Sequence, residues 1–274
     1  MSANPPVPEP TTMRPMNAAP RIRTRWLITA AVLALAACAG RPTPSPRPTA
    51  GSNQLVLVTT PGWDASQATV HRYERSGDRW QPVGAAWPAI IGRSGAAWGL
   101  GRHPDVAGAP VKREGDGRAP AGVFAIGTAF GYGETADTAL PYAPMTAGDW
   151  CIDVPGSTLY NRIVNVDEVG AAAIEGSTEP MRRDLHKDGD MRYVKGFVIE
   201  HNTAAVPQGG SCIFAHVWKT PDTPTAGCTA MDADHMQALL AWLDPAARPL
   251  LVLLPEAEHA RFHAAWGLPA PAGD

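Results

Sequence analysis

Short strand-like segments, each ended by glycine or proline, limit most strongly what this chain can fold into. Leu55–Thr60 is largely apolar and stops at Pro61-Gly62, and Ala68–Glu74 alternates apolar with polar residues. Alternation of this kind is typical of β-strands that bury one face. The 27 glycines and 28 prolines among 274 residues leave little room for long helices. The chain is therefore predicted to be mainly β.

The same pattern predicts further strands and a few short helices. Five more strand segments are expected, at Trp80–Ile91, Val123–Ile126, Phe197–Glu200, Cys212–Trp218 and Leu250–Leu254. Short helices are expected at Glu179–Leu185, at Glu256–Trp266 and from the N-cap Asp232 through Leu243. No internal repeat or second linker interrupts these segments. We therefore expect a single domain over residues 54–268, mainly β with a few short peripheral helices.

The first 37 residues are typical of a signal peptide. Arginines at positions 14, 21, 23 and 25 precede an uncharged run of 12 residues, Trp26–Ala37. That run is too short to span a bilayer, which takes about 20 residues, but it fits a signal-peptide core. It leads into Leu35-Ala36-Ala37-Cys38, which resembles a bacterial lipobox, where the cysteine is diacylated and becomes the mature N-terminus. An ordinary secretory signal cleaved near Ala37 is the alternative.

Residues 38–53 are predicted to be a tether that begins at the lipidated Cys38. Four prolines lie among threonine, serine and glycine, a composition that stays extended and buries no core. Acyl chains on Cys38 would then anchor the protein to a membrane, with the folded part in the periplasm. Because Ala39 follows Cys38, we expect passage to the outer membrane of a bacterial cell envelope.

The charge balance argues against a nucleic-acid partner. Only 18% of the residues are charged, and the formal net charge is −3. Proteins that bind the phosphate backbone of a nucleic acid carry a basic surface instead. We expect a monomer with no nucleic-acid ligand.

One segment combines the residue types of thiol catalysis. The strand-like Ser211–Trp218 carries His216, a proline-rich loop follows, and Cys228 comes after Gly227 and just ahead of an expected helix. A histidine can take the thiol proton and a helix N-terminus favours the thiolate, so we expect a lowered pKa for Cys228. The backbone N–H groups around Gly227 and Thr229 are expected to form an oxyanion hole.

Two motifs in this order resemble those of the L,D-transpeptidase (YkuD) family. Thr225-Ala226-Gly227-Cys228 fits the family's Ser/Thr-x-Gly-Cys signature, and His216 fits the histidine at the end of the preceding strand. Upstream, Lys112–Phe124 resembles the family's Lys-x-x-Gly-x-Gly-x-Thr-Pro-x-Gly-x-Phe segment. The resemblance covers roughly residues 90–254.

Membership would imply a mixed-sheet β-sandwich or barrel of the L,D-transpeptidase type that acts on peptidoglycan peptide stems. Cys228 would attack the carbonyl of the third stem residue, a meso-diaminopimelate, and release the terminal D-alanine. The thioester would then pass to an amine, forming a crosslink or another attachment in the cell wall. His216 would act as base towards Cys228 and as acid towards the leaving amine. The resemblance implies no metal and no organic cofactor.

Ala230 departs from the family pattern, which has an arginine near the substrate carboxylate at this position. The sequence Gly-Cys-x-Ala-Met at 227–231 is similar to a subgroup that includes members assigned to hydrolysis. Two alternatives therefore stay open. One is an L,D-carboxypeptidase or amidase-type thiol hydrolase on the same stems. The other is a catalytically silent, lipid-anchored peptidoglycan-binding module. Arg162 and Arg182 are candidates for the carboxylate recognition that Ala230 cannot supply.

Other polar residues near this segment have two interpretations each. His201 and Asn202 end a predicted strand, where they either line the substrate cleft or turn the chain, and Thr225 is a further candidate for substrate binding. Cys151 and Cys212 either form a disulfide, as cysteines often do in an oxidising compartment, or remain buried thiols.

A zinc site is a weaker alternative for the histidines and cysteines of this region. Its four ligands would be His201, Cys212, His216 and Cys228, with spacings of 11, 4 and 12. These spacings are not the short paired spacings of structural zinc sites. We therefore expect no metal.

Overall fold

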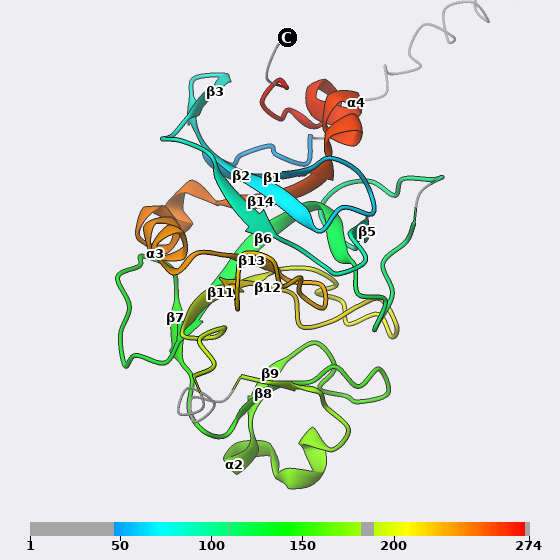
Figure 1. The fold of residues 1–274 in the computed structure, drawn as a ribbon, viewed down its shortest axis with the longest axis vertical. Coiled ribbons are helices and arrows are strands. Elements are labelled where there is room, and N and C mark those ends of the chain that lie inside the picture. The colour runs from blue at the N-terminus through cyan, green and yellow to red at the C-terminus, as the bar shows by residue number, and fades with distance from the viewer. Residues whose placement is uncertain (1–46, 109, 182–188, 272–274) are drawn as a thin grey trace, which may run out of the picture. The chain divides into compact units, whose positions relative to one another are not determined.

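One mixed sheet closes on itself, because strand β1 pairs with β14 on one side and with β2 on the other. The structure is a computed structural model, and it describes residues 47–108, 110–181 and 189–271. Figure 1 shows the ribbon. Around the closed path the strands are β1 (Gln54–Thr60), β14 (Leu250–Pro255), β6 (Ala119–Gly131), β11 (Lys195–Ile199), β12 (Phe214–Val217), β13 (Thr229–Met231), β4 (Trp87–Ile90) and β2 (Gln67–Ser76).

Short strands branch from this ring, and a second sheet lies apart from it. β3 (Arg79–Pro82) pairs with β2, while β5 (Ala96–Trp98) and β7 (Tyr142–Pro144) pair with β6. The second sheet has the order β10 (Glu179–Pro180), β8 (Asp149–Cys151) and β9 (Ile163–Asn165). Two short helices, α2 (Val166–Val169) and the 3-10 helix η2 (Ala171–Ile174), follow β9, and Figure 1 shows this green region apart from the ring.

The longest described helices lie in the C-terminal part of the chain. α3 (Ala233–Trp242) begins after its N-cap Asp232, whose side chain accepts a hydrogen bond from the N–H of Asp234. A short 3-10 helix, η4 (Pro245–Ala247), leads into β14, and α4 (Glu256–Trp266) follows it. α3 buries Met236, Leu239 and Leu240 on one stripe. This apolar stripe is what holds the helix against the sheet.

Two hydrophobic clusters hold the described residues together. The larger one runs through β1, β14 and the core-facing side of α3, and every residue of β14 is buried. The smaller cluster joins the ring to the second sheet and holds all three described cysteines. Its aromatic members, Phe130, Tyr193 and Phe214, meet edge to face at centroid distances of 5.4 to 5.9 Å. This smaller cluster positions the candidate site.

The predicted fold class is confirmed, since the chain is mainly β with a closed mixed sheet and a few short helices. The helices predicted after Asp232 and at Glu256–Trp266 are confirmed. The prediction of a helix at Glu179–Leu185 is wrong for its first residues, because Glu179 and Pro180 form strand β10. Residues 182–185 of that predicted helix lie outside the described residues. Pairing with Cys151 and Trp150 of β8 is the long-range contact that overrides the local pattern.

The predicted strand segments differ from the observed strands mainly at their ends. Trp80–Ile91 forms two strands, β3 and β4, which pair with different parts of β2. Val123–Ile126 is the middle of a longer strand, β6, which has 13 residues. Its length comes from pairing with both β14 and β11, which no local pattern reveals.

The predicted signal peptide (1–37), the lipidation site Cys38 and residues 38–46 of the predicted tether lie outside the described residues. The rest of that tether is packed rather than extended. Thr49 and Ser52 are buried, and the Thr49 hydroxyl donates to the carbonyl of Trp266 at 2.6 Å. Within the described residues, no helix is long and apolar enough to cross a membrane.

Candidate functional site

Cys228 lies buried at the start of strand β13, with its sulfur held against the strand that carries His216. Its Sγ accepts a hydrogen bond from the N–H of Phe214 at 3.3 Å, and the thiol donates to the carbonyl of Cys212 at 3.5 Å. The residue is 6% exposed. Burial, and secondly the negative charge of Glu179, raise the pKa of the Cys228 thiol to about 12. The resting side chain is therefore a thiol at neutral pH.

His216, on strand β12, is the neighbouring base. It is 4% exposed, and its Nδ1 donates to the carbonyl of Val217 at 2.8 Å, which leaves Nε2 as the unprotonated nitrogen. Burial lowers the pKa of His216 to about 4. His216 and Cys228 line the same cavity, of about 130 Å³. The site thus pairs a neutral imidazole with a neutral thiol.

The prediction that a helix N-terminus lowers the pKa of Cys228 is wrong. Strand β13 intervenes between the cysteine and α3, which begins only at Ala233. The influence of a helix dipole falls off within the first turn, so it does not reach the thiol. Burial dominates instead, and it shifts the pKa of Cys228 upward rather than downward.

The turn before Cys228 is held by Thr225. The Thr225 hydroxyl donates to the carbonyl of Cys228 at 2.6 Å and accepts from the N–H of Gly227 at 3.1 Å. A side chain at Gly227 would place its Cβ 3.0 Å from the carbonyl oxygen of Arg118, closer than packed neighbours normally come. The Gly227 N–H is thus engaged inside the turn. Thr229 lies opposite Ala215 in the parallel pairing of β12 with β13.

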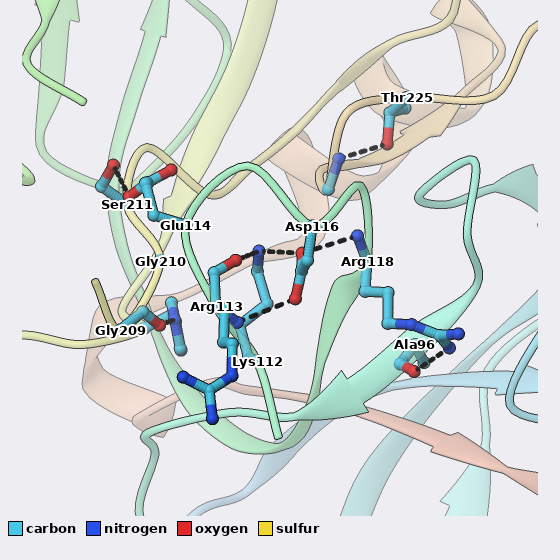
Figure 2. A network of polar contacts seen from close by, with 12 residues as sticks. Ala96, Lys112, Arg113, Glu114, Asp116, Arg118, Gly209, Gly210, Ser211 and Thr225 are labelled. Atoms are coloured by element: carbon cyan, nitrogen blue, oxygen red, sulfur yellow. Dashed lines mark hydrogen bonds and ion pairs between the residues drawn. The ribbon is translucent and has the colours of Figure 1, made fainter. Parts of the chain in front are cut away.

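A second cavity, of about 230 Å³, also reaches Cys228. Its lining includes Lys112 and Glu114, from the upstream motif that the sequence singled out. Figure 2 shows how this loop is held. The ammonium of Lys112 contacts Asp116 at 2.6 Å, and Asp116 also accepts the backbone N–H groups of Arg113 and Arg118. The motif therefore folds into a loop that is closed on itself by one carboxylate.

Glu114 ties that loop to the segment leading into β12. Its carboxylate accepts a hydrogen bond from the Ser211 hydroxyl at 2.7 Å (Figure 2) and another from the hydroxyl of Tyr160. Its backbone N–H donates to the carbonyl of Gln208 at 3.0 Å. Two motifs that are far apart in the sequence thus meet at Cys228.

Three residues that the sequence analysis did not single out line the smaller cavity with Cys228 and His216. They are Glu179, Arg192 and Tyr193. Tyr193 is buried and meets His216 edge to face, with 5.3 Å between the ring centroids, and its hydroxyl donates to Glu179. Arg192 forms an ion pair with Asp190 at 2.6 Å. No motif flagged these residues, because they come from a stretch without clear periodicity.

His201 and Asn202 have structural roles. His201 Nδ1 accepts the N–H of Leu100 at 3.2 Å and Nε2 donates to the carbonyl of Gly209 at 3.0 Å, so both ring nitrogens are engaged. Asn202 has a positive φ of 51°, and its side chain bonds to the backbone of Val206 and Gly210. Of the two interpretations left open for this pair, the local turn is the one that the contacts favour.

The two arginine candidates do not meet the thiol within the described residues. Arg162 is exposed and lines a different, larger cavity of about 680 Å³ that does not reach Cys228. Arg182 lies outside the described residues. Among the described residues, the cations that line the cavity of Cys228 and His216 are instead Arg192 and Lys219.

Cys151 and Cys212 form a disulfide, which is one of the two interpretations that the sequence left open for them. The bond links β8 of the second sheet to the segment just before β12, and the carbonyl of Cys212 is the one that receives the Cys228 thiol. It also rules out the zinc alternative, because a disulfide sulfur cannot serve as a thiolate ligand. Among the described residues, no group of three or more histidine, cysteine or carboxylate side chains is placed to hold a metal.

Comparison with known proteins gives no match. No family model fits the chain, and neither the curated proteins nor the solved structures contain a match. The resemblance to the L,D-transpeptidase family therefore stays a prediction, carried by the motifs at Lys112–Phe124 and Thr225–Cys228.

Proposed function

We propose that this protein is a cysteine-dependent L,D-transpeptidase that acts on tetrapeptide stems of peptidoglycan. The observation that carries the proposal is the shared cavity of Cys228 and His216, which is lined by a buried thiol and by an imidazole whose Nε2 is unprotonated. The resemblance of both motifs to the family points to the same chemistry. No resident metal or organic cofactor enters the reaction.

In the first half of the reaction, Cys228 and His216 make the bond changes and the proton transfers. Sγ attacks the carbonyl of the third stem residue while its proton moves to His216 Nε2. The tetrahedral adduct then collapses: the bond from carbon to the D-alanine nitrogen breaks, and His216 returns the proton to that nitrogen. The N–H of Phe214 already points at Sγ and stabilises the negative charge that develops on it.

Arg192 supplies the positive charge that Ala230 cannot. Both residues line the cavity with Cys228, and Lys219 is a further cation there. Arg192 is half exposed, and Asp190 holds its Nε and Nη2. Because Arg192 lines the cavity with Cys228 and no hydrogen bond to its Nη1 is found within the described residues, we assign this side of the guanidinium to the carboxylate of the stem.

The setting of the enzyme belongs to the same proposal. A signal peptide over residues 1–37 and acylation at Cys38 would anchor it in the bacterial envelope, most consistently at the outer membrane, facing the periplasm. The Cys151–Cys212 disulfide fits an oxidising compartment.

The test is to incubate the purified domain with tetrapeptide muropeptides and read the products by mass spectrometry. The proposal predicts a crosslinked dimer that has lost one D-alanine, absent with Cys228→Ala and with His216→Gln. His201→Gln is the matched control, because His201 is equally buried and its pKa is also lowered to about 4, but it lines neither cavity of Cys228. That variant should keep the dimer.

A thiol hydrolase on the same stems is the second candidate, favoured by Ala230 in place of the family's arginine. Loss of D-alanine with only tripeptide as product would establish it. Unchanged stems with the wild-type protein would contradict both enzymes and favour the binding module.

A further inference from the structure

Glu179 occupies the junction between the two cavities that reach Cys228. It lines the cavity of about 130 Å³ with His216 and the cavity of about 230 Å³ with Lys112. Strand pairing fixes this place. Glu179 lies opposite Cys151 in the second sheet, Cys151 is bonded to Cys212, and the carbonyl of Cys212 receives the Cys228 thiol.

One carboxyl oxygen of Glu179 is anchored and the other is open. Oε1 accepts the hydroxyl of Tyr193, whose buried ring packs against His216. No hydrogen bond to Oε2 is found within the described residues, and the residue keeps partial solvent exposure. A carboxylate that is oriented by a phenol and presents a free oxygen to a cavity is suited to receive a cation or a proton.

The charges around Glu179 tune it for proton transfer near neutrality. The pKa of Glu179 is raised to about 7, mainly by burial and to a smaller extent by the negative charges of Asp153 and Asp190. The hydrogen bond from Tyr193 and the charge of Arg192 act in the opposite direction. A base works best when its pKa lies near the working pH. The uncharged thiol of Cys228 and imidazole of His216 complete its surroundings.

We propose that Glu179 binds and deprotonates the ammonium group of the acceptor, so that the thioester is resolved by an amine rather than by water. This inference rests on the proposed function and adds a catalytic residue for its second half. His216 already serves the donor half, and an amine that arrives as an ammonium ion needs a base of its own before it can attack.

The second half then balances as follows. The acceptor ammonium gives one proton to Glu179 Oε2 and becomes a free amine. Its nitrogen attacks the thioester carbonyl, the C–N bond forms, and its next proton passes to His216 Nε2. The C–S bond breaks, and His216 returns that proton to the Cys228 thiolate. Glu179 finally releases its proton to solvent, which restores the starting enzyme.

The experiment measures how the acyl-enzyme partitions between crosslinked dimer and tripeptide in Glu179→Gln. Glu200→Gln is the matched control, because burial also raises the pKa of Glu200 but that residue lines only the larger, separate cavity. We expect E179Q to form the acyl-enzyme on Cys228 at nearly the wild-type rate, with a dimer-to-tripeptide ratio reduced roughly tenfold or more. E200Q should behave as wild type.

A second acceptor separates proton transfer from mere loss of structure. Methoxyamine is uncharged at neutral pH and needs no deprotonation, so its transfer should be the same in E179Q and in the wild type. A dimer-to-tripeptide ratio unchanged in E179Q would overturn the role of Glu179 while leaving the proposed function intact. Absence of any acyl-enzyme in the wild type would overturn both.

If E179Q does not acylate, Tyr193→Phe provides the same test. It keeps the carboxylate but removes the hydrogen bond that lowers the pKa of Glu179. The pH midpoint of amine transfer should then move upward. An unchanged midpoint would overturn the proposal.

Discussion

At the scale of single residues, the site is organised around two uncharged groups. Burial moves the pKa of Cys228 up and that of His216 down, so a thiolate–imidazolium pair does not form in the resting site. Their chemistry therefore depends on proton transfer during attack rather than on a preformed thiolate. The arrangement keeps the thiol unreactive until a carbonyl group lies next to it.

This account predicts slow alkylation of native Cys228. A thiol with a pKa of about 12 is far less ionised at pH 7 than one with the ordinary pKa of about 9, so the iodoacetamide rate should be at least about a hundredfold lower. The rate should also keep rising with pH above 9. The same protein unfolded in urea is the control and should react at the ordinary rate. A plateau of the native rate near pH 7 would contradict the neutral pair.

At the scale of elements, the site is assembled by links between segments far apart in sequence. The disulfide Cys151–Cys212 closes a loop of 61 residues and joins the second sheet to the entry of β12. The loop at 112–118 is closed by Asp116 and tied to Ser211 through Glu114. Each link fixes a wall of the cavities that reach Cys228.

Removing the disulfide should destabilise the fold. A double Cys151→Ser, Cys212→Ser variant should lose about 2–4 kcal/mol of unfolding free energy, because its unfolded chain is no longer restricted by the crosslink. Urea denaturation followed by tryptophan fluorescence measures this. Wild-type protein treated with reductant should show the same loss. Equal midpoints for oxidised and reduced wild type would show that the bond does not restrain the fold.

Asp116→Asn should be costly, because it leaves the buried ammonium of Lys112 with only the neutral carbonyl of Arg113 and without its charged partner. The Lys112 side chain is 4% exposed, and breaking a buried pair costs about 3–5 kcal/mol. Glu258→Gln is the control: it breaks the pair with Arg261, whose side chain is 58% exposed, and should cost at most about 1 kcal/mol. Thermal and urea unfolding of both variants would test this, and equal small losses would argue against the buried pair.

At the scale of the whole molecule, closure of the sheet explains what the sequence could and could not predict. The segments that became β1, β2 and β14 were predicted because each carries its own apolar pattern. Cys228 and His216 could be predicted as site residues because they lie only 12 positions apart and Cys228 belongs to a recognisable motif. Glu179 was missed because it reaches the cavity through the pairing of β10 with β8 and through the disulfide. Arg192 and Tyr193 were missed because they lie beside β12 only in the folded chain, where the N–H of Val217 donates to the carbonyl of Arg192.

Acid should destabilise the folded molecule through its buried histidines. His201 and His216 have pKa values lowered to about 4 in the fold, against about 6.5 in the unfolded chain. The unfolded state thus binds more protons between those values, and stability present above pH 6.5 is lost as pH falls through 4. The loss is on the order of 3 kcal/mol for each histidine.

Urea titrations between pH 7 and pH 4 measure this acid effect. His201→Gln and His216→Gln should each show a flatter dependence than the wild type. His263→Gln, which replaces a half-buried histidine that is hydrogen-bonded to the carbonyl of Ala260, is the comparison variant for loss of an imidazole. Parallel curves for all four proteins would contradict the assignment to buried histidines.

Intact-mass spectrometry of the protein mixed with a tetrapeptide stem tests the central claim most directly, because it detects the bond to sulfur itself. The account predicts that the wild type gains the mass of the stem less D-alanine, that peptide mapping places this mass on Cys228, and that hydroxylamine removes it. Cys228→Ala should gain nothing. A wild type that releases D-alanine without any adduct on Cys228, or an adduct that persists in Cys228→Ala, would contradict thiol catalysis at this site.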